Sequence, residues 1–123
     1  MKKVTFLLLL TFAFINGKAQ LQNTKWRGTI TLDTEIDVVF NYKNDTLDVV
    51  SLADGSSLES MTYTSTDSVL NLKKINGQSN CDNSNMGKYK FSIKDDVLYL
   101  ELLSDICDDR SSVLSNSKWT KTK

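Results

Sequence analysis

The sequence predicts an all-β domain, an eight-stranded antiparallel up-and-down meander barrel, and three observations lead to it. Apolar residues alternate with polar ones through most of the chain, which is typical of strands with one buried face. The segments between these runs are mostly short and rich in Asp, Asn, Gly and Ser, which favours hairpins. No stretch of about a dozen residues carries a helical apolar stripe, so parallel crossovers are not expected.

The first predicted strand covers residues 25–33, "KWRGTITLD", where Trp26, Gly28 and Ile30 share one face. The second, 36–43, repeats the alternation. The other six predicted strands are 46–53, 58–65, 68–75, 87–94, 97–103 and 112–121. The tightest predicted turn is the pair Asp95 and Asp96.

An exported sheet of this size has to protect its two edge strands, because exposed edges template aggregation. Closing the sheet into a barrel removes the edges, although an open β-sandwich also fits eight short strands. Closure would place Trp26 and Trp119 on neighbouring strands at one end of the barrel, where they would form a plug. Two unrelated core tryptophans explain the same residues equally well.

The first nineteen residues indicate the compartment. Residues 1–19 begin with two lysines, continue with an apolar run and end with Gly17 and Ala19 at the positions of a cleavage site, which predicts a signal peptide. The apolar run of about twelve residues is shorter than the roughly twenty of a membrane-spanning helix, and no second candidate follows it. We therefore expect a periplasmic or secreted domain, residues 20–123, without a transmembrane segment after cleavage.

Charge argues against nucleic acid as a partner. The whole chain has 15 basic and 15 acidic residues, and removal of Lys2, Lys3 and Lys18 leaves 12 basic ones. The mature domain is then mildly acidic, and its lysines are scattered along the chain. Phosphate backbones are bound by clustered Lys and Arg instead.

The two cysteines are predicted to form a disulfide. In the barrel, Cys81 and Cys107 fall in connections at the same rim, opposite the tryptophans, and exported domains are usually oxidised. Closing this loop would stabilise the fold by roughly 3 kcal/mol on the chain-entropy account. A catalytic thiol is disfavoured, because the chain has no histidine and the aspartates beside Cys107 would raise a thiol pKa.

Asp82, Asp105, Asp108 and Asp109 could meet at this rim and offer oxygen ligands for calcium. The spacing does not match a calcium-binding loop, Asp is common in exposed turns, and Arg110 can neutralise one carboxylate, so we expect no metal site and no other cofactor. Catalysis is not expected either. The chain cannot build a Ser/His/Asp relay, and no acidic pair is singled out by its spacing.

Two stretches resemble a known family. "NTKWRGTI" resembles the first strand of lipocalins and related calycin barrels, and "GKYKFSIKDDVLYLELLSDICDDR" is similar to small secreted bacterial lipocalin-like domains. Here Trp26 precedes Gly28 by two residues. The expected topology places Arg110 at the rim opposite Trp26, so the arginine that packs over this tryptophan in lipocalins is not assigned.

The resemblance implies a barrel that holds a small apolar molecule. Large side chains on apolar faces could line such a pocket: Phe40, Tyr42, Met61, Tyr63, Phe91 and Leu100. We favour the alternative that they fill the interior, which would require a small ligand or one that sits near the mouth. The expected function is a non-enzymatic, exported binding protein for a small hydrophobic ligand at the Cys81 and Cys107 rim. The alternative is an envelope or secreted interaction module, or an inhibitor, that meets a protein partner through the disulfide-linked loops.

Overall fold

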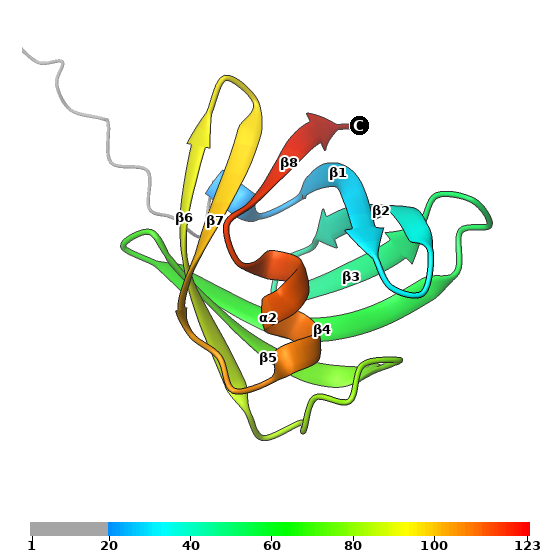
Figure 1. The fold of residues 1–123 in the computed structure, drawn as a ribbon. Coiled ribbons are helices and arrows are strands. Elements are labelled where there is room, and N and C mark those ends of the chain that lie inside the picture. The colour runs from blue at the N-terminus through cyan, green and yellow to red at the C-terminus, as the bar shows by residue number, and fades with distance from the viewer. Residues whose placement is uncertain (1–19) are drawn as a thin grey trace, which may run out of the picture.

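The computed structural model describes residues 20–123 as a closed antiparallel β-barrel (Figure 1). Successive strands lie side by side around the barrel, and a short helix, α2 (Asp108–Leu114), separates the last two. The strands are β1 (Thr24–Thr31), β2 (Glu35–Tyr42), β3 (Thr46–Ser51), β4 (Ser57–Thr66), β5 (Val69–Gly77), β6 (Met86–Lys94), β7 (Val97–Ser104) and β8 (Ser117–Thr122). The predicted signal peptide, residues 1–19, lies outside the described residues.

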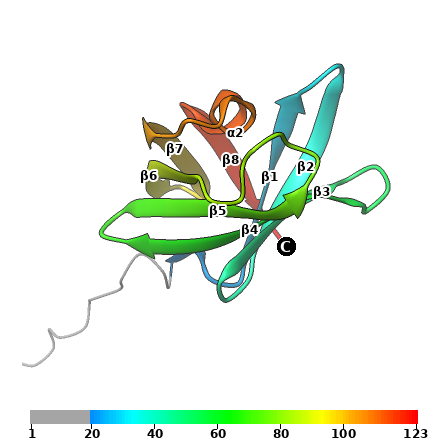
Figure 2. The ribbon, with the colours of Figure 1, turned by 90° about the horizontal axis from the view of Figure 1, so that it is seen from below.

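The barrel closes where β1 pairs with β8. Lys25 pairs with Thr122 and Arg27 with Thr120, while the other edge of β1 pairs with β2 along its whole length. Figure 2 shows the same closed arrangement from below. The prediction of an up-and-down barrel is confirmed, and the alternative of an open sandwich is wrong, because the first and last strands share hydrogen bonds instead of lying in separate layers.

Alternation along the strands builds the interior. Every second residue of β2 from Val38 to Tyr42 is buried, and β3, β4 and β6 show the same pattern. Since successive side chains of a strand point to opposite faces, one face of each strand supplies the core. The buried aliphatic and aromatic residues form one cluster: Leu21, Trp26, Ile30, Val38, Phe40, Tyr42, Leu47, Val49, Met61, Tyr63, Leu70, Leu72, Tyr89, Phe91, Leu98, Leu100, Leu114 and Trp119.

A glycine lets a tryptophan cross the closing strand pair. A Cβ at Gly28 of β1 would overlap the ring of Trp119 from β8. Because Gly28 has no side chain, Trp119 reaches over β1 and stacks on Phe40 of β2, with ring centroids 4.2 Å apart. Trp26 is also buried, two residues from Gly28. The two tryptophans therefore lie on neighbouring strands, as expected from closure.

Tyr42 and Tyr63 pack near the short β2–β3 turn, with ring centroids 5.1 Å apart in an edge-to-face arrangement. The hydroxyl of Tyr63 donates to the carbonyl of Lys43, and Tyr42 Oη makes no hydrogen bond within residues 20–123. Burial raises the pKa of Tyr42 above its ordinary range, and burial together with Asp45 raises that of Tyr63 to about 12. Both phenols therefore stay neutral in the folded protein.

The last predicted strand is partly wrong. Residues 112–121 were expected to be extended, but Ser112 to Leu114 belong to α2, and β8 begins only at Ser117. A helix of seven residues is too short for its apolar periodicity to stand out. Its two buried residues, Arg110 and Leu114, are four apart and so share one face. Asp108 and Asp109 occupy its first turn, where acidic side chains favour a helix N-terminus.

Because β8 starts late, it covers only part of β7. Val97 to Leu100 pair with β8, whereas the rest of β7 runs on beside α2 (Figure 1). The helix thereby occupies the rim at which the β7–β8 and β5–β6 connections meet. Within residues 20–123, no helix is both long and apolar enough to cross a membrane.

Candidate functional site

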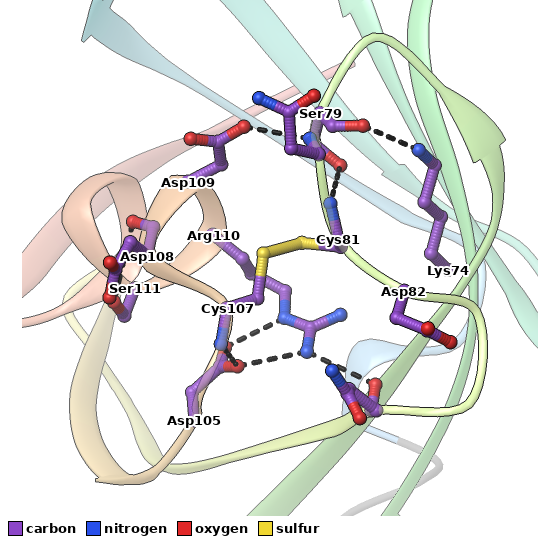
Figure 3. The surroundings of a disulfide bond; sticks show 12 residues. Lys74, Ser79, Cys81, Asp82, Asp105, Cys107, Asp108, Asp109, Arg110 and Ser111 are labelled. Carbon is purple, nitrogen blue, oxygen red and sulfur yellow. Dashed lines mark hydrogen bonds and ion pairs between the residues drawn. A yellow bond between two sulfur atoms is a disulfide. The ribbon is translucent and has the colours of Figure 1, made fainter.

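A disulfide joins the two longest connections of the barrel at one rim. Cys81 of the β5–β6 connection is bonded to Cys107, the residue before α2, and their Cα atoms are 5.3 Å apart (Figure 3). The predicted disulfide is confirmed. It links the loop after β5 to the start of α2, and so holds both segments over the same end of the barrel.

Beside the disulfide lies a buried ion pair. Arg110 donates from Nε to Asp105 Oδ2 at 2.7 Å and from Nη2 to Asp105 Oδ1 at 2.9 Å, and the two side chains are only 3% and 0% exposed. Nη2 also donates to the carbonyl of Asn85. Figure 3 shows Arg110 reaching past Cys107 to this carboxylate. The expectation that Arg110 neutralises one aspartate is confirmed.

Tyr89, a buried residue of β6, completes the ion-pair cluster. Its hydroxyl donates to Asp105 Oδ2 at 2.5 Å, and the amide of Cys107 donates to Oδ1 at 2.9 Å. Burial raises the pKa of Asp105, but the hydrogen bonds from Arg110, Tyr89 and Cys107 outweigh it, and the pKa lies below its ordinary value. Burial lowers the pKa of Arg110, and Asp105 more than restores it. Both groups therefore remain charged.

The ion pair also explains Gly87 of β6. A Cβ at this position would overlap both the carboxylate of Asp105 and Nε of Arg110. The pair therefore lies directly on the backbone of β6. Sequence reasoning missed Tyr89 and Gly87 in this cluster, because nothing in a β-strand pattern indicates which inward residue will face a loop carboxylate.

Two further carboxylates tether the β5–β6 connection. Asp109 of α2 accepts a hydrogen bond from the amide of Asn80 at 2.7 Å. Glu59 of β4 accepts hydrogen bonds from the amide and the hydroxyl of Ser79, and Lys74 Nζ donates to the carbonyl of the same serine at 2.6 Å. The rim is thus held by the disulfide and by charged side chains from β4, β5 and α2.

A cavity of about 250 Å³ opens at this rim, between α2, the β1–β2 hairpin, β3 and β4. Most of its wall is apolar, and polar groups lie on the side of α2 and the β5–β6 connection. Its lining residues are Ile30, Leu32, Phe40, Val49, Leu58, Glu59, Met61, Gln78, Ser79, Asp109, Arg110, Ser112, Val113 and Leu114.

The cavity contains only part of the predicted pocket. Phe40 and Met61 line it. Tyr42 and Tyr63 pack against each other near the β2–β3 turn, away from the cavity lining. The lining residues that sequence reasoning missed include Val113 and Leu114 of α2, because the helix itself was not predicted.

Phe91 and Leu100 lie elsewhere. They border a second depression of about 410 Å³ along β6, β7 and the start of β8. Their own side chains are 2% exposed and belong to the core, while its other border residues include Lys90, Glu101 and Lys118. Most of its border residues are polar or charged, so this depression is less apolar than the rim cavity.

The four aspartates considered for calcium have separate partners or face solvent. Asp105 binds Arg110, Asp109 binds the Asn80 amide, and Asp82 accepts from the amide and hydroxyl of Ser84. Asp108 lies exposed in the first turn of α2. Across residues 20–123, no three His, Cys, Asp or Glu side chains are grouped closely enough to hold a metal ion.

Comparison with known proteins adds no relative from which a role could be transferred. No protein-family model, no curated protein sequence and no solved structure matches the chain.

Proposed function

We propose that the protein is an exported, non-enzymatic binding protein that holds a small, mainly apolar molecule in the cavity at the disulfide-linked rim. The observation that carries the proposal is the apolar wall formed by β1–β4 and closed on one side by α2. Burying apolar ligand surface against such a wall is favourable by roughly 25 cal/mol per Å². The resemblance of the first strand to lipocalins points to the same class of function.

The size of the cavity limits the ligand. An apolar cavity of about 150 Å³ binds benzene, which has six carbon atoms. By that ratio the rim cavity, at about 250 Å³, holds roughly ten non-hydrogen atoms. A linear alcohol such as 1-octanol, or a small bicyclic molecule, has about this size. Long-chain lipids would extend out of the cavity, because Tyr42, Tyr63, Phe91 and Leu100 fill the barrel elsewhere.

Two observations support the non-enzymatic part of the proposal. The sequence contains no histidine, the residue that most often acts as a general acid or base. The carboxylates near the cavity, Glu59, Asp105 and Asp109, each accept hydrogen bonds from nearby backbone or side-chain groups that position the rim. Export is supported by the signal-like residues 1–19 and by the disulfide.

The proposal is tested by titrating 1-octanol into protein produced from the full chain in an oxidising compartment. For a ligand of this size we expect a dissociation constant on the order of 10 µM. The variant Leu58→Trp places a larger side chain in the cavity wall and should abolish binding. The matched variant Leu52→Trp, at an exposed position outside the lining, should bind as the wild type does. Equal binding by the two variants would refute the proposed site.

A second candidate function is contact with another protein through the same rim. Ile106, which lies between Asp105 and Cys107, is 75% exposed, and Leu103 is 52% exposed. Met86, at the start of β6, is 43% exposed, and β6 pairs with the end of β7 from Lys88 onward. Exposed apolar side chains that gather into one patch are typical of interaction sites. Partners retained by the wild type and lost by Ile106→Asp, with octanol binding unchanged, would favour this function.

A further inference from the structure

We propose that the rim cavity selects apolar molecules that carry a basic amine over molecules of the same size that carry a carboxylate. This inference rests on the proposed binding function and specifies the chemical class of its ligand. It follows from the charges that line the cavity, and from the partners that each of them already has.

Two carboxylates line the cavity on its polar side. Glu59 projects from β4 and Asp109 from α2. Both hold the β5–β6 connection, but a carboxylate offers about four acceptor sites and these contacts use fewer. The hydrogen bonds that Asp109 accepts within residues 20–123 involve Oδ2 and leave Oδ1 available. Both groups can therefore accept a further hydrogen bond from a ligand.

The basic residue in the lining is Arg110, and its charge is already compensated. Two of its nitrogens bind the two oxygens of Asp105, in the geometry by which arginine recognises a carboxylate. An incoming carboxylate would have to compete with Asp105 for the guanidinium. Nη1 of Arg110 makes no hydrogen bond within the described residues, and it is the feature that favours an anion. Lys74 is not part of the lining, and its ammonium group donates to the Ser79 carbonyl.

Among the residues that line the cavity, the balance of charge is therefore negative. The Arg110–Asp105 pair is neutral as a unit, and Glu59 and Asp109 remain. Apolar walls reduce the local dielectric and strengthen the field of these two groups compared with open solvent. A protonated amine at the mouth is attracted by both carboxylates, whereas a ligand carboxylate is repelled by both.

The test compares octylamine, 1-octanol and octanoate at pH 7, three molecules with the same chain and different head groups. In 50 mM salt we expect octylamine to bind at least tenfold more tightly than octanoate, with octanol between them. Because exposed charges are screened, the ratio should fall as salt is raised to 500 mM. The salt series uses the wild-type protein and does not depend on any variant folding.

The double variant Glu59→Gln/Asp109→Asn removes both charges and keeps amide oxygens that can accept the Ser79 and Asn80 hydrogen bonds. We expect the ratio of octylamine to octanoate affinity to fall towards one. The control Asp95→Asn/Asp96→Asn changes the net charge equally in the β6–β7 turn, at the opposite end of the barrel and outside the lining, and should leave the ratio unchanged.

Octanol binding together with an octanoate affinity equal to or above that of octylamine would overturn the charge preference and leave the proposed function intact. Octanoate binding more tightly would assign the anchoring role to Arg110 Nη1. An amine preference that persists in the double variant would overturn the role of Glu59 and Asp109. If none of the three compounds binds the wild-type protein, the proposed function itself is wrong.

Discussion

The ring of Trp119 on β8 occupies the space above Gly28 on β1. The two strands that close the barrel are therefore joined by side-chain packing as well as by backbone hydrogen bonds. The same ring stacks on Phe40, which lines the rim cavity. Gly28 is therefore required for a steric reason, and its backbone dihedrals play no part in it. Closure of the sheet and the inner wall of the cavity depend on one another through these three residues.

Gly28→Ala should destabilise the protein by about 1–3 kcal/mol, since the added methyl group overlaps the Trp119 ring. Trp119→Leu alone should cost roughly 3 kcal/mol through loss of buried aromatic surface. A leucine at position 119 leaves room for the methyl group of an alanine at position 28. The double variant should therefore be clearly more stable than the sum of the single effects predicts. Urea denaturation of the four proteins measures this coupling, and strictly additive effects would contradict the contact.

Loss of the disulfide should destabilise the domain by about 3 kcal/mol, because the unfolded chain gains the entropy of an open loop. The measurement is denaturant unfolding of Cys81→Ser/Cys107→Ser beside the wild type. Adding a reductant should lower the stability of the wild type to that of the variant, and should not affect the variant. A wild-type protein that is insensitive to reductant would argue against a disulfide at this rim.

Asp105→Asn should be the most damaging single change at the rim. It leaves Arg110 buried without its counter-charge, which typically costs about 3–5 kcal/mol. Replacing both members, Asp105→Asn/Arg110→Met, should recover much of that loss, because no isolated charge remains. The neighbouring exposed Asp108→Asn is the control and should change stability by less than about 0.5 kcal/mol.

The ion pair of Asp105 and Arg110 should make the stability of the protein depend on pH in the acid range. The pKa of Asp105 is lowered by folding, so its contribution to stability is fully present above the unfolded pKa of about 3.9 and is lost as pH falls through the lower folded pKa. Stability of the wild type should therefore drop steeply below about pH 4. The drop should be shallower in Asp105→Asn, and identical slopes in the two proteins would contradict the ion pair.

Ionisation of Tyr63 should lower the stability of the protein at high pH. Its pKa is raised to about 12 by burial and by Asp45, so its neutral form stabilises the fold below the unfolded value of about 10, and this contribution is lost as pH rises towards 12. Tyr63→Phe should unfold less steeply between these values, although Tyr42 and Tyr89 still contribute. The exposed Tyr99→Phe is the matched control, and should behave as the wild type does.

Much of the fold was predictable because period-two alternation is a local signal and hairpins are short. The two-residue turn at Asp95 and Asp96 has positive φ at both positions, 54° and 62°, as the favoured hairpin turns require. The disulfide was also predictable, because an up-and-down order decides which connections share a rim. Both inferences need only the sequence order of the strands.

The rim was less predictable because it depends on side chains meeting across the barrel. Helix α2 has only seven residues, too few for a recognisable apolar periodicity, and the alternation of the sequence predicts Val113 and Leu114 as strand residues. Tyr89 meets Asp105 across sixteen residues of sequence, a pairing that no spacing rule contains. Of the six predicted pocket residues, two line the cavity, Phe40 and Met61. The other four point inward as well, and the sequence pattern does not distinguish a filled layer of the interior from a hollow one.

The central claim, that a small apolar molecule occupies the rim cavity, is tested most directly by methyl NMR during a titration with octylamine. The account predicts chemical-shift changes for Ile30, Val49, Leu58, Met61, Val113 and Leu114, which line the cavity, and none for Leu52 or Ile75, which are exposed elsewhere. Changes restricted to exposed side chains such as Leu103 and Ile106, with the cavity methyl groups unmoved at saturating octylamine, would contradict it.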